Sequence, residues 1–259
     1  MLFRSSTNFR TPSEQTLFSG WFDGFQYFYP NPNLKPEYSV SEDVGYRYQG
    51  EWLTGSITFF NYNFTNRQIS TQSALNSSAN ESINAGNQTT RGIDIEGGMR
   101  PWHHISPYFS AEYLHSVEDS NLFAGTLGGG ALGTPGNTAV YLPTAGKTSI
   151  RSPEVQAALG LSYDDGNFFG TFSVKYVDSQ YGTFMNDEGI PSYITTNLAV
   201  GARLPSDGLR ARPEVKLNLM NLGGASYLSA VANPGETAGS SSYYLAGGFA
   251  MMFTATQAF

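Results

Sequence analysis

Two carboxylates, Asp94 and Glu96, stand two positions apart in a stretch where apolar and polar residues alternate. Side chains two positions apart lie on the same face of a β-strand, so such a pair could act as general acid and base. Cationic side chains take the polar positions of other alternating stretches, and these are Arg47, Lys175, Arg203 and Lys216. Because nearby cations favour ionised carboxylates, we interpret the group as a charge network on a sheet wall, with a structural role.

The three histidines are poorly spaced for chemistry. His103 and His104 are adjacent, so in a turn their rings need not converge, and His115 lies at the other end of the following alternating stretch. Cysteine is absent, which removes thiolate ligands and disulfide bonds. A hydrolase would also need a serine, a histidine and a carboxylate that converge. The sequence therefore predicts no metal site and no catalytic residue.

Gly128, Gly130 and Gly133 have the spacing of a dinucleotide-binding fingerprint. That fingerprint must follow a strand and open a helix, but the surrounding AGTLGGGALGTPGNT has no helical pattern. We predict an exposed loop without a cofactor.

Two acidic pairs have simpler interpretations. Asp164 and Asp165 precede Gly166 and Asn167, which together are typical of a hairpin turn. Glu118 and Asp119 open a long polar connection, and we predict that this pair forms a solvated loop edge.

The composition indicates strands and turns. Aromatic residues make up 14% of the 259 residues, and charged residues only 14%, against roughly 25% in typical globular chains. A net charge of -7 argues against a general nucleic-acid binder. No apolar run approaches the roughly 20 residues of a transmembrane helix, and the first residues, MLFRSSTNFR, lack the apolar core of a signal peptide. Any export signal is expected to lie outside this chain.

Alternation with a period of two recurs along the whole sequence and predicts about ten strands. We place them at 1–10, 39–48, 52–64, 88–100, 105–115, 155–163, 168–176, 194–204, 214–219 and 243–259. The last stretch alternates large apolar residues with small or polar ones over 17 positions. We expect Leu245, Phe249, Met251 and Phe253 on lipid, and Ala246, Ala250, Thr254 and Thr256 on the opposite, lumen face.

Short and long connections alternate between these strands, as they do in bacterial outer-membrane barrels. If the strand ending at Phe259 descends to the periplasm, every short turn is periplasmic and every long loop extracellular. Aromatic residues then fall beside the short turns, where an interfacial girdle belongs: Trp52, Trp102, Tyr163 and Phe168. A soluble β-sandwich also alternates, but its strands are shorter and nothing sorts its loops by length.

Five stretches, in order, carry a family resemblance: FRTPSEQTLF from Phe9, NPNLKPEYS from Asn31 continuing into SEDVGYR, NQTTRGIDIEGG from Asn87, LNLMNLGGASYL from Leu217, and the aromatic-terminated end. Together they resemble the mid-to-late barrel of TonB-dependent outer-membrane receptors. The run Gly223-Gly224-Ala225 departs from the family pattern, which usually has a bulkier or charged residue there.

The resemblance implies an all-β, antiparallel, up-and-down transmembrane barrel in the bacterial cell outer membrane. Such receptors have about 22 strands and a plugged lumen, so residues 1–259 are expected to be the C-terminal part of one, without the plug domain, the TonB box and the N-terminal strands. The implied function is energy-coupled import of a scarce bulky nutrient such as a ferric siderophore. The TonB complex would act through the missing plug, and ligand would meet the extracellular loops at 11–35, 66–87, 118–148, 178–189 and 222–242. Their Tyr, Phe and Asn content suits aromatic chelates or sugars equally.

Two alternatives remain open from the sequence. The chain could close on itself as a small porin or barrel enzyme, which requires contact between the regions of Phe9 and Phe249. It could also be a soluble β-sandwich binding module.

Overall fold

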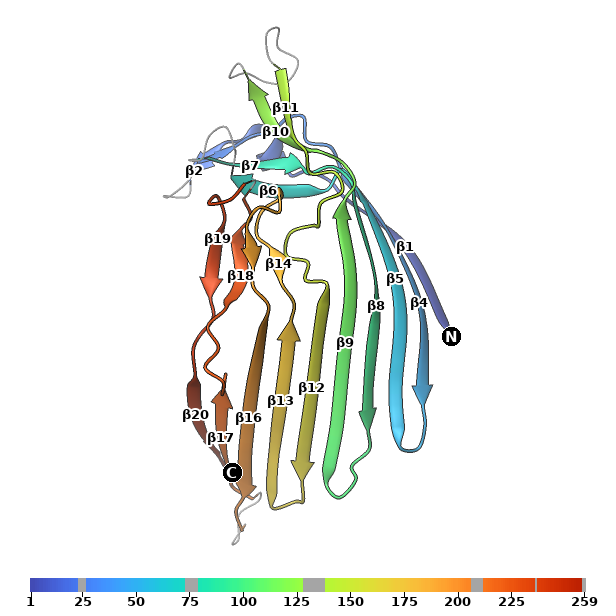
Figure 1. Cartoon of the computed structure of the whole chain (residues 1–259), viewed down its shortest axis with the longest axis vertical. Coiled ribbons are helices and arrows are strands. Elements are labelled where there is room, and N and C mark those ends of the chain that lie inside the picture. Colours follow the sequence, from blue (N-terminus) through green and yellow to red (C-terminus); the bar gives the residue numbers. More distant parts are fainter. Residues whose placement is uncertain (23–26, 73–78, 128–137, 206–211, 236, 258–259) are drawn as a thin grey trace.

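The main body of the computed structural model is one curved antiparallel wall of ten strands (Figure 1). The structure describes residues 1–22, 27–72, 79–127, 138–205, 212–235 and 237–257. The strands follow one another in chain order: β1 (Leu2–Arg10), β4 (Glu37–Gln49), β5 (Leu53–Thr65), β8 (Gln88–Met99), β9 (Ile105–Glu118), β12 (Val155–Asp164), β13 (Phe168–Val177), β16 (Tyr193–Arg203), β17 (Glu214–Met220) and β20 (Ala250–Thr256). The predicted ten strands and antiparallel order are confirmed.

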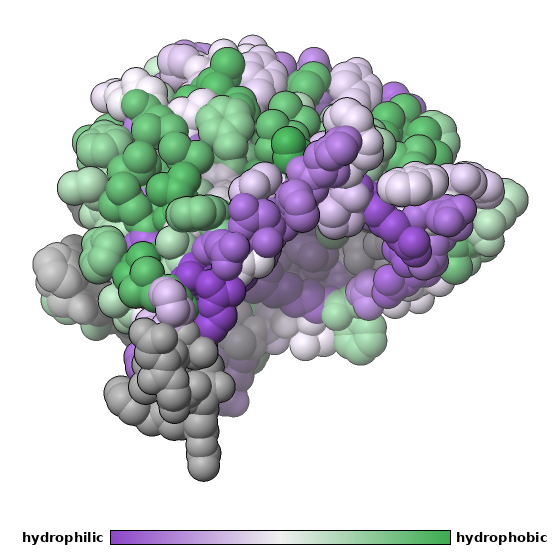
Figure 2. Space-filling model, turned by 90° about the horizontal axis from the view of Figure 1, so that it is seen from below, coloured by the Kyte–Doolittle hydropathy of each residue, from purple (hydrophilic) through white to green (hydrophobic). Residues whose placement is uncertain are grey.

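The wall is amphipathic because its ladders keep apolar and polar residues in separate rows. Ile57 pairs with Ile95, and Ile95 with Ala111, whereas the next row joins Thr58, Asp94 and Glu112. The apolar row faces outward without a covering layer, so Phe59, for example, is 50% exposed. Seen from below, hydrophobic residues gather over the outer convex surface and hydrophilic residues around the concave one (Figure 2). A single layer of this kind excludes the sandwich alternative, which needs two packed sheets.

The connections sort by length to the two ends of the wall, as expected (Figure 1). We call these the turn end and the loop end. The loop end holds further elements in segments predicted to be plain connections: α1 (Glu14–Phe18), β2 (Trp21–Phe22), β3 (Tyr27–Tyr29), β6 (Gln68–Gln72), β7 (Ala79–Asn84), β10 (Leu122–Leu127), β11 (Thr138–Leu142), β14 (Gln180–Tyr181), β15 (Gly189–Ile190), β18 (Leu228–Asn233) and β19 (Ser242–Leu245). Three connections meet in a small buried cluster of Ile83, Ala85, Leu122 and Phe184.

The prediction of one strand over 243–259 was wrong. Its first part forms β19, which pairs with β18 in a separate hairpin, and the wall strand β20 begins only at Ala250. The partner strand β17 stops at Met220 because Asn221 and Gly224 adopt positive φ and turn the chain away. The ladder between β17 and β20 therefore ends at the pair Met220 and Ala250. Within β20 the face assignment is confirmed, since Met251 and Phe253 pair with Leu219 and Leu217.

The wall is open in this structure. Among the described residues, β1 and β20 lie at opposite edges of the sheet, and no ladder joins them. The pairing that a self-contained ten-stranded barrel requires is thus not present in the described part of the chain. None of the described helices is long and apolar enough to cross a membrane.

Candidate functional site

The concave face carries a polar cavity of about 550 Å³ in the middle of the wall. Strands β4, β5, β8, β9, β12 and β13 position it, because their polar rows all point inward. Its charged lining residues are Arg47, Asp94, Glu96, Glu112 and Lys175. The structure thus brings together the predicted pair Asp94 and Glu96 with two of the four predicted cations.

The expected charge network on this wall forms only in part. Ser56 Oγ donates to Glu96 Oε1 at 2.9 Å, and Gln156 Nε2 donates to Glu112 Oε2 at 3.5 Å. In the described part of the chain, none of the three ion pairs within 4.0 Å involves Asp94 or Glu96. Neutral donors, Ser56 and Gln156, thus bind Glu96 and Glu112. The described lining of the cavity therefore combines three carboxylates and two cations without an ion pair among them.

The other two predicted cations lie elsewhere. Lys216 is in β17, where it pairs with Gly201 of β16 and Thr254 of β20, several strands away from β8. Arg203 lies at the turn end, where Nη1 is 2.7 Å from Asp164 Oδ1 and Nε is 2.9 Å from Glu214 Oε1. At least three strands stand between β8 and each of them, so assigning them to the network of Asp94 was wrong.

The histidines do not converge. His103 and His104 have positive φ in the turn before β9, and their rings contact Trp102 and Tyr163. His115 Nδ1 lies 3.9 Å from Glu154 Oε1 near the other end of β9. Throughout the described ranges, no group of three histidine or carboxylate side chains could hold a metal ion. The glycine fingerprint at Gly128, Gly130 and Gly133 lies outside the described residues.

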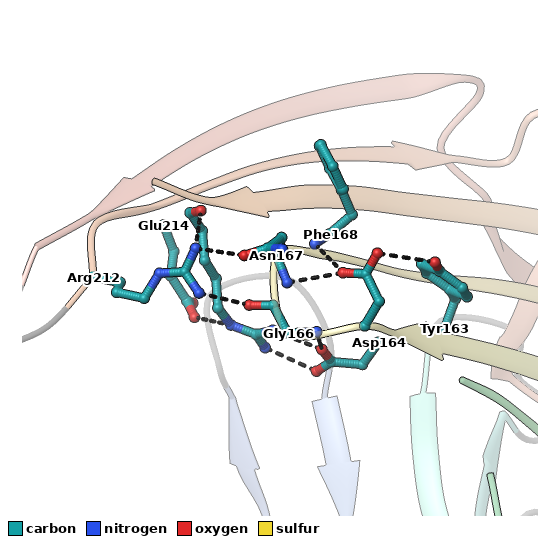
Figure 3. Close-up of polar contacts among 9 residues, drawn as sticks. Tyr163, Asp164, Gly166, Asn167, Phe168, Arg212 and Glu214 are labelled. Carbon is teal, nitrogen blue, oxygen red and sulfur yellow. Dashed lines mark hydrogen bonds and ion pairs between the residues drawn. The ribbon is translucent and has the colours of Figure 1, made fainter. Parts of the chain in front are cut away.

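The turn end has a well-ordered polar cluster around the hairpin that joins β12 to β13 (Figure 3). Asp164 Oδ1 accepts from the backbone N–H of Gly166, and Asp165 Oδ1 accepts from those of Asn167 and Phe168. Arg203 binds Asp164 with both terminal nitrogens. Both aspartates are therefore turn formers, as predicted.

Removing the Asp165 carboxylate should weaken this hairpin. The N–H groups of Phe168 and Asn167 lower the pKa of Asp165. The contribution of its carboxylate to folding stability is therefore present above the ordinary aspartate range, about pH 4, and is lost as the pH falls through the lowered pKa. We expect Asp165→Ala to lower the thermal unfolding temperature at pH 7 and to converge with the wild type in acid. Circular dichroism in mild detergent measures both.

Asp165→Asn is the matched control, since its amide oxygen can still accept from both N–H groups. It should keep most of the stability at pH 7 and lose the acid dependence. Equal unfolding temperatures of Asp165→Ala and the wild type at pH 7 would contradict this account.

At the loop end, hydrogen bonds tie three connections into one unit. Arg151 Nη2 donates to the carbonyl oxygens of Val231 and Ala232 at 2.6 and 3.1 Å. Asn186 Nδ2 donates to Thr148 O at 2.8 Å, and Ser241 Oγ donates to Gly182 O at 2.7 Å. These contacts join the segments 118–155, 177–193 and 220–250, which the sequence analysis had treated separately.

The prediction that Glu118 lies on a solvated loop edge was wrong. Only 2% of it is exposed, because residues 144–149 return over the end of β9 and exchange backbone bonds with it through Gly146 and Lys147. Asp119 is exposed as predicted and accepts from Thr89 Oγ1 at 2.7 Å.

Aromatic side chains also gather at the loop end. Tyr193 and Tyr227 stack with ring centroids 4.0 Å apart, and Phe123 meets Tyr141 edge-on at 5.6 Å. Tyr141 is 57% exposed. Stacking surfaces of this kind suit planar or sugar-like ligands, and sequence reasoning foresaw their composition but not their pairing.

A family model described as "TonB dependent receptor-like, beta-barrel" matches residues 2–222. The chain belongs to the TonB-dependent receptor β-barrel family. The five motif stretches and the observed ten-stranded wall agree with this assignment, and the recognition from sequence is confirmed. As a member of this family, the protein is located in the outer membrane. The turn end is therefore periplasmic and the loop end extracellular.

Solved receptors share the fold of this TonB-dependent receptor segment at low identity. The copper transporter OprC is 13% identical with a TM-score of 0.66, and the match covers 97% of this chain and 35% of that one. The ferric yersiniabactin uptake receptor FyuA from Yersinia pestis is 14% identical with a TM-score of 0.64, covering 97% and 33%. The ferric citrate transporter FecA is 18% identical with a TM-score of 0.61, covering 86% and 31%.

The chain thus spans about a third of the length of the structures it matches. No curated protein matches the sequence. The family and the structural neighbours are transport receptors.

Proposed function

We propose that this chain forms part of the barrel wall and extracellular binding surface of an energy-coupled uptake receptor. Its cargo would be a scarce, bulky nutrient such as a ferric siderophore. The observation that carries the proposal is the interlocked, aromatic loop end on an amphipathic wall of the TonB-dependent receptor family. The protein would act as a transporter and not as an enzyme.

The concave cavity supports a role in holding a plug. Asp94, Glu96 and Glu112 give this face acidic groups that direct salt bridges do not neutralise within the described residues. A surface of this kind favours a polar, hydrated and movable partner over a permanently packed one. We propose that the wall faces the plug domain, through which the TonB complex would act.

The loop end supports ligand capture. Tyr141 offers an exposed ring, and the bonds from Arg151 and Asn186 limit how far the loops can move apart. Preorganised loops lose less conformational entropy when they bind a ligand. The ligand would therefore contact several connections at once.

Uptake of iron-55 chelates by cells that make the full receptor tests the proposal. Saturable binding should persist after the proton-motive force is collapsed, while uptake should stop, because the family mechanism draws energy from the inner membrane. Tyr141→Ala should weaken ligand binding roughly 5-fold or more, the equivalent of about 1 kcal/mol for a stacking contact.

Tyr46→Ala is the matched control, since Tyr46 is equally exposed at 56% but lies on the outward face of β4 beside Ile57. It should leave binding unchanged. Uptake that is insensitive to the uncoupler and rises without saturation would indicate a passive pore and overturn the proposal.

A further inference from the structure

An apolar groove of about 430 Å³ opens on the outward face of the wall, close to the periplasmic turns. It is centred on Gly170, which pairs with Tyr163 on one side and Val200 on the other. The notch at this position is bordered by Leu161, Tyr163, Phe168, Phe172, Leu198 and Val200. We call this notch the Gly170 groove. It lies in the interior of the sheet, away from the edge strands β1 and β20.

The groove ends at the polar hairpin described above. Tyr163 and Phe168 border it and also flank the turn of residues 164–167. The ring of Phe168 points away from the polar cluster, and the Tyr163 hydroxyl donates to Asp165 Oδ2 at 3.0 Å (Figure 3). The Gly170 groove and the polar hairpin thus share Tyr163 and Phe168 at the turn end of the wall.

Arg212 supplies the cation of that patch. Its guanidinium donates to Gly166 O at 2.9 Å and to Asn167 Oδ1 at 2.8 Å, and it also binds the carbonyl oxygens of Arg203 and Leu204. All four acceptors are neutral, so its charge has no carboxylate partner within 4.0 Å among the described residues. A guanidinium has five N–H donors, which leaves one Nη1 hydrogen for a ligand.

The patch also contains anions. Asp165 lies two residues from Asn167 in the same turn, whereas Asp164 and Glu214 are already paired with Arg203. Because both signs stand side by side, the patch is complementary to a headgroup that carries both a phosphate and an ammonium. The carboxylates would repel a purely anionic headgroup. A headgroup with a bulky quaternary ammonium would have no N–H group to donate to them.

We propose that the Gly170 groove and Arg212 form a phospholipid site for the periplasmic leaflet, with a preference for a phosphoethanolamine headgroup. One acyl chain lies in the groove, the phosphate contacts Arg212, and the ammonium faces Asp165. The outward face of a membrane wall is in contact with acyl chains, so a lipid is the occupant that the location supplies.

Native mass spectrometry of the full receptor tests the site after extraction in mild detergent and addition of defined lipids. One phosphatidylethanolamine should be retained in preference to phosphatidylcholine or phosphatidylglycerol. Val200→Trp, which fills the groove from its border, should lower retention about tenfold. Arg212→Gln should do the same by removing a charge-assisted hydrogen bond, and Arg212→Lys should restore part of it.

Ile95→Trp is the matched control, because Ile95 is 40% exposed on the outward row of β8, away from the groove, and Val200 is 44% exposed. It should retain lipid like the wild type. Equal retention of the three lipids, an equal loss in Ile95→Trp, or unchanged retention in folded Val200→Trp would overturn the proposal. So would a copurified protein that competes with lipid for the groove. None of these outcomes depends on the transported cargo.

Discussion

Replacing Gly92 by alanine is expected to destabilise the folded wall by about 1–3 kcal/mol, the usual cost of overpacking a filled site. A Cβ at this position would collide with the carbonyl oxygen of Tyr113 and with the ring of Phe60, which lies only 2.5 Å away at Cζ. Phe60 is 7% exposed and stacks on Tyr62. The carbonyl oxygen of Tyr113 belongs to the β8–β9 ladder and cannot move without disturbing it, and the Phe60 ring is buried against its neighbours. Urea unfolding followed by tryptophan fluorescence measures the loss.

Gly160→Ala is the matched control, since the nearest heavy atom to a Cβ there is 4.0 Å away. It should be neutral or slightly stabilising, because alanine costs less backbone entropy than glycine. Equal unfolding curves for Gly92→Ala and the wild type would contradict the steric account. The second glycine of the stretch NQTTRGIDIEGG, Gly97, also lies beneath an aromatic ring, that of Phe109.

The wall could be predicted from the sequence because each of its strands has one face in contact with lipid and the other with water. That difference imposes a period of two on the sequence, as in Ile93, Asp94, Ile95 and Glu96. The short turns fix every second antiparallel pair, β4–β5, β8–β9, β12–β13 and β16–β17. The order of the remaining strands follows from the up-and-down arrangement that the family resemblance implies. Strand count, topology and the outward row were therefore accessible without a structure.

The loop end was not accessible in the same way. Its sheet β2-β3-β7-β6 has a parallel step between β3 and β7, which joins segments about fifty residues apart. Stretches such as QISTQ and ANESIN contain a single isoleucine each, so a polar composition concealed their strands. Burial of Glu118 likewise depends on residues 144–149, which return from a distant part of the chain.

The candidate site was predictable by residue type but not by partner. The period of two predicted that Asp94 and Glu96 lie on the same inward face of their strand, and the structure confirms this. Parity gives no information on where a residue lies around the curved wall, so Arg203 was assigned to the wrong carboxylates. The end of β17 at Asn221 also depends on local backbone geometry that alternation does not encode.

Replacing Arg151 by alanine should release the extracellular loops from one another and weaken ligand retention. Arg151 Nη2 bridges segment 118–155 to segment 220–250 through the carbonyl oxygens of Val231 and Ala232. Hydrogen bonds from a charged donor contribute about 1.5–3 kcal/mol. Arg151 is solvent-exposed, so we discount this to about 1–2 kcal/mol, which corresponds to a roughly 5–30-fold larger population of open loops.

Limited trypsin digestion of intact cells, with cleavage after Lys147 as the readout, measures the opening, and ligand dissociation measures its functional consequence. Both rates should rise together in Arg151→Ala, because a ligand held by several connections leaves when they separate. Lys35→Ala is the matched control: Lys35 is an exposed cation on another extracellular connection, and its hydrogen bonds to Gln68 and Asn84 use backbone groups. If proteolysis became faster while ligand dissociation stayed unchanged, the bridge made by Arg151 would have no role in ligand retention. The ligand would then contact the segments that Arg151 does not join.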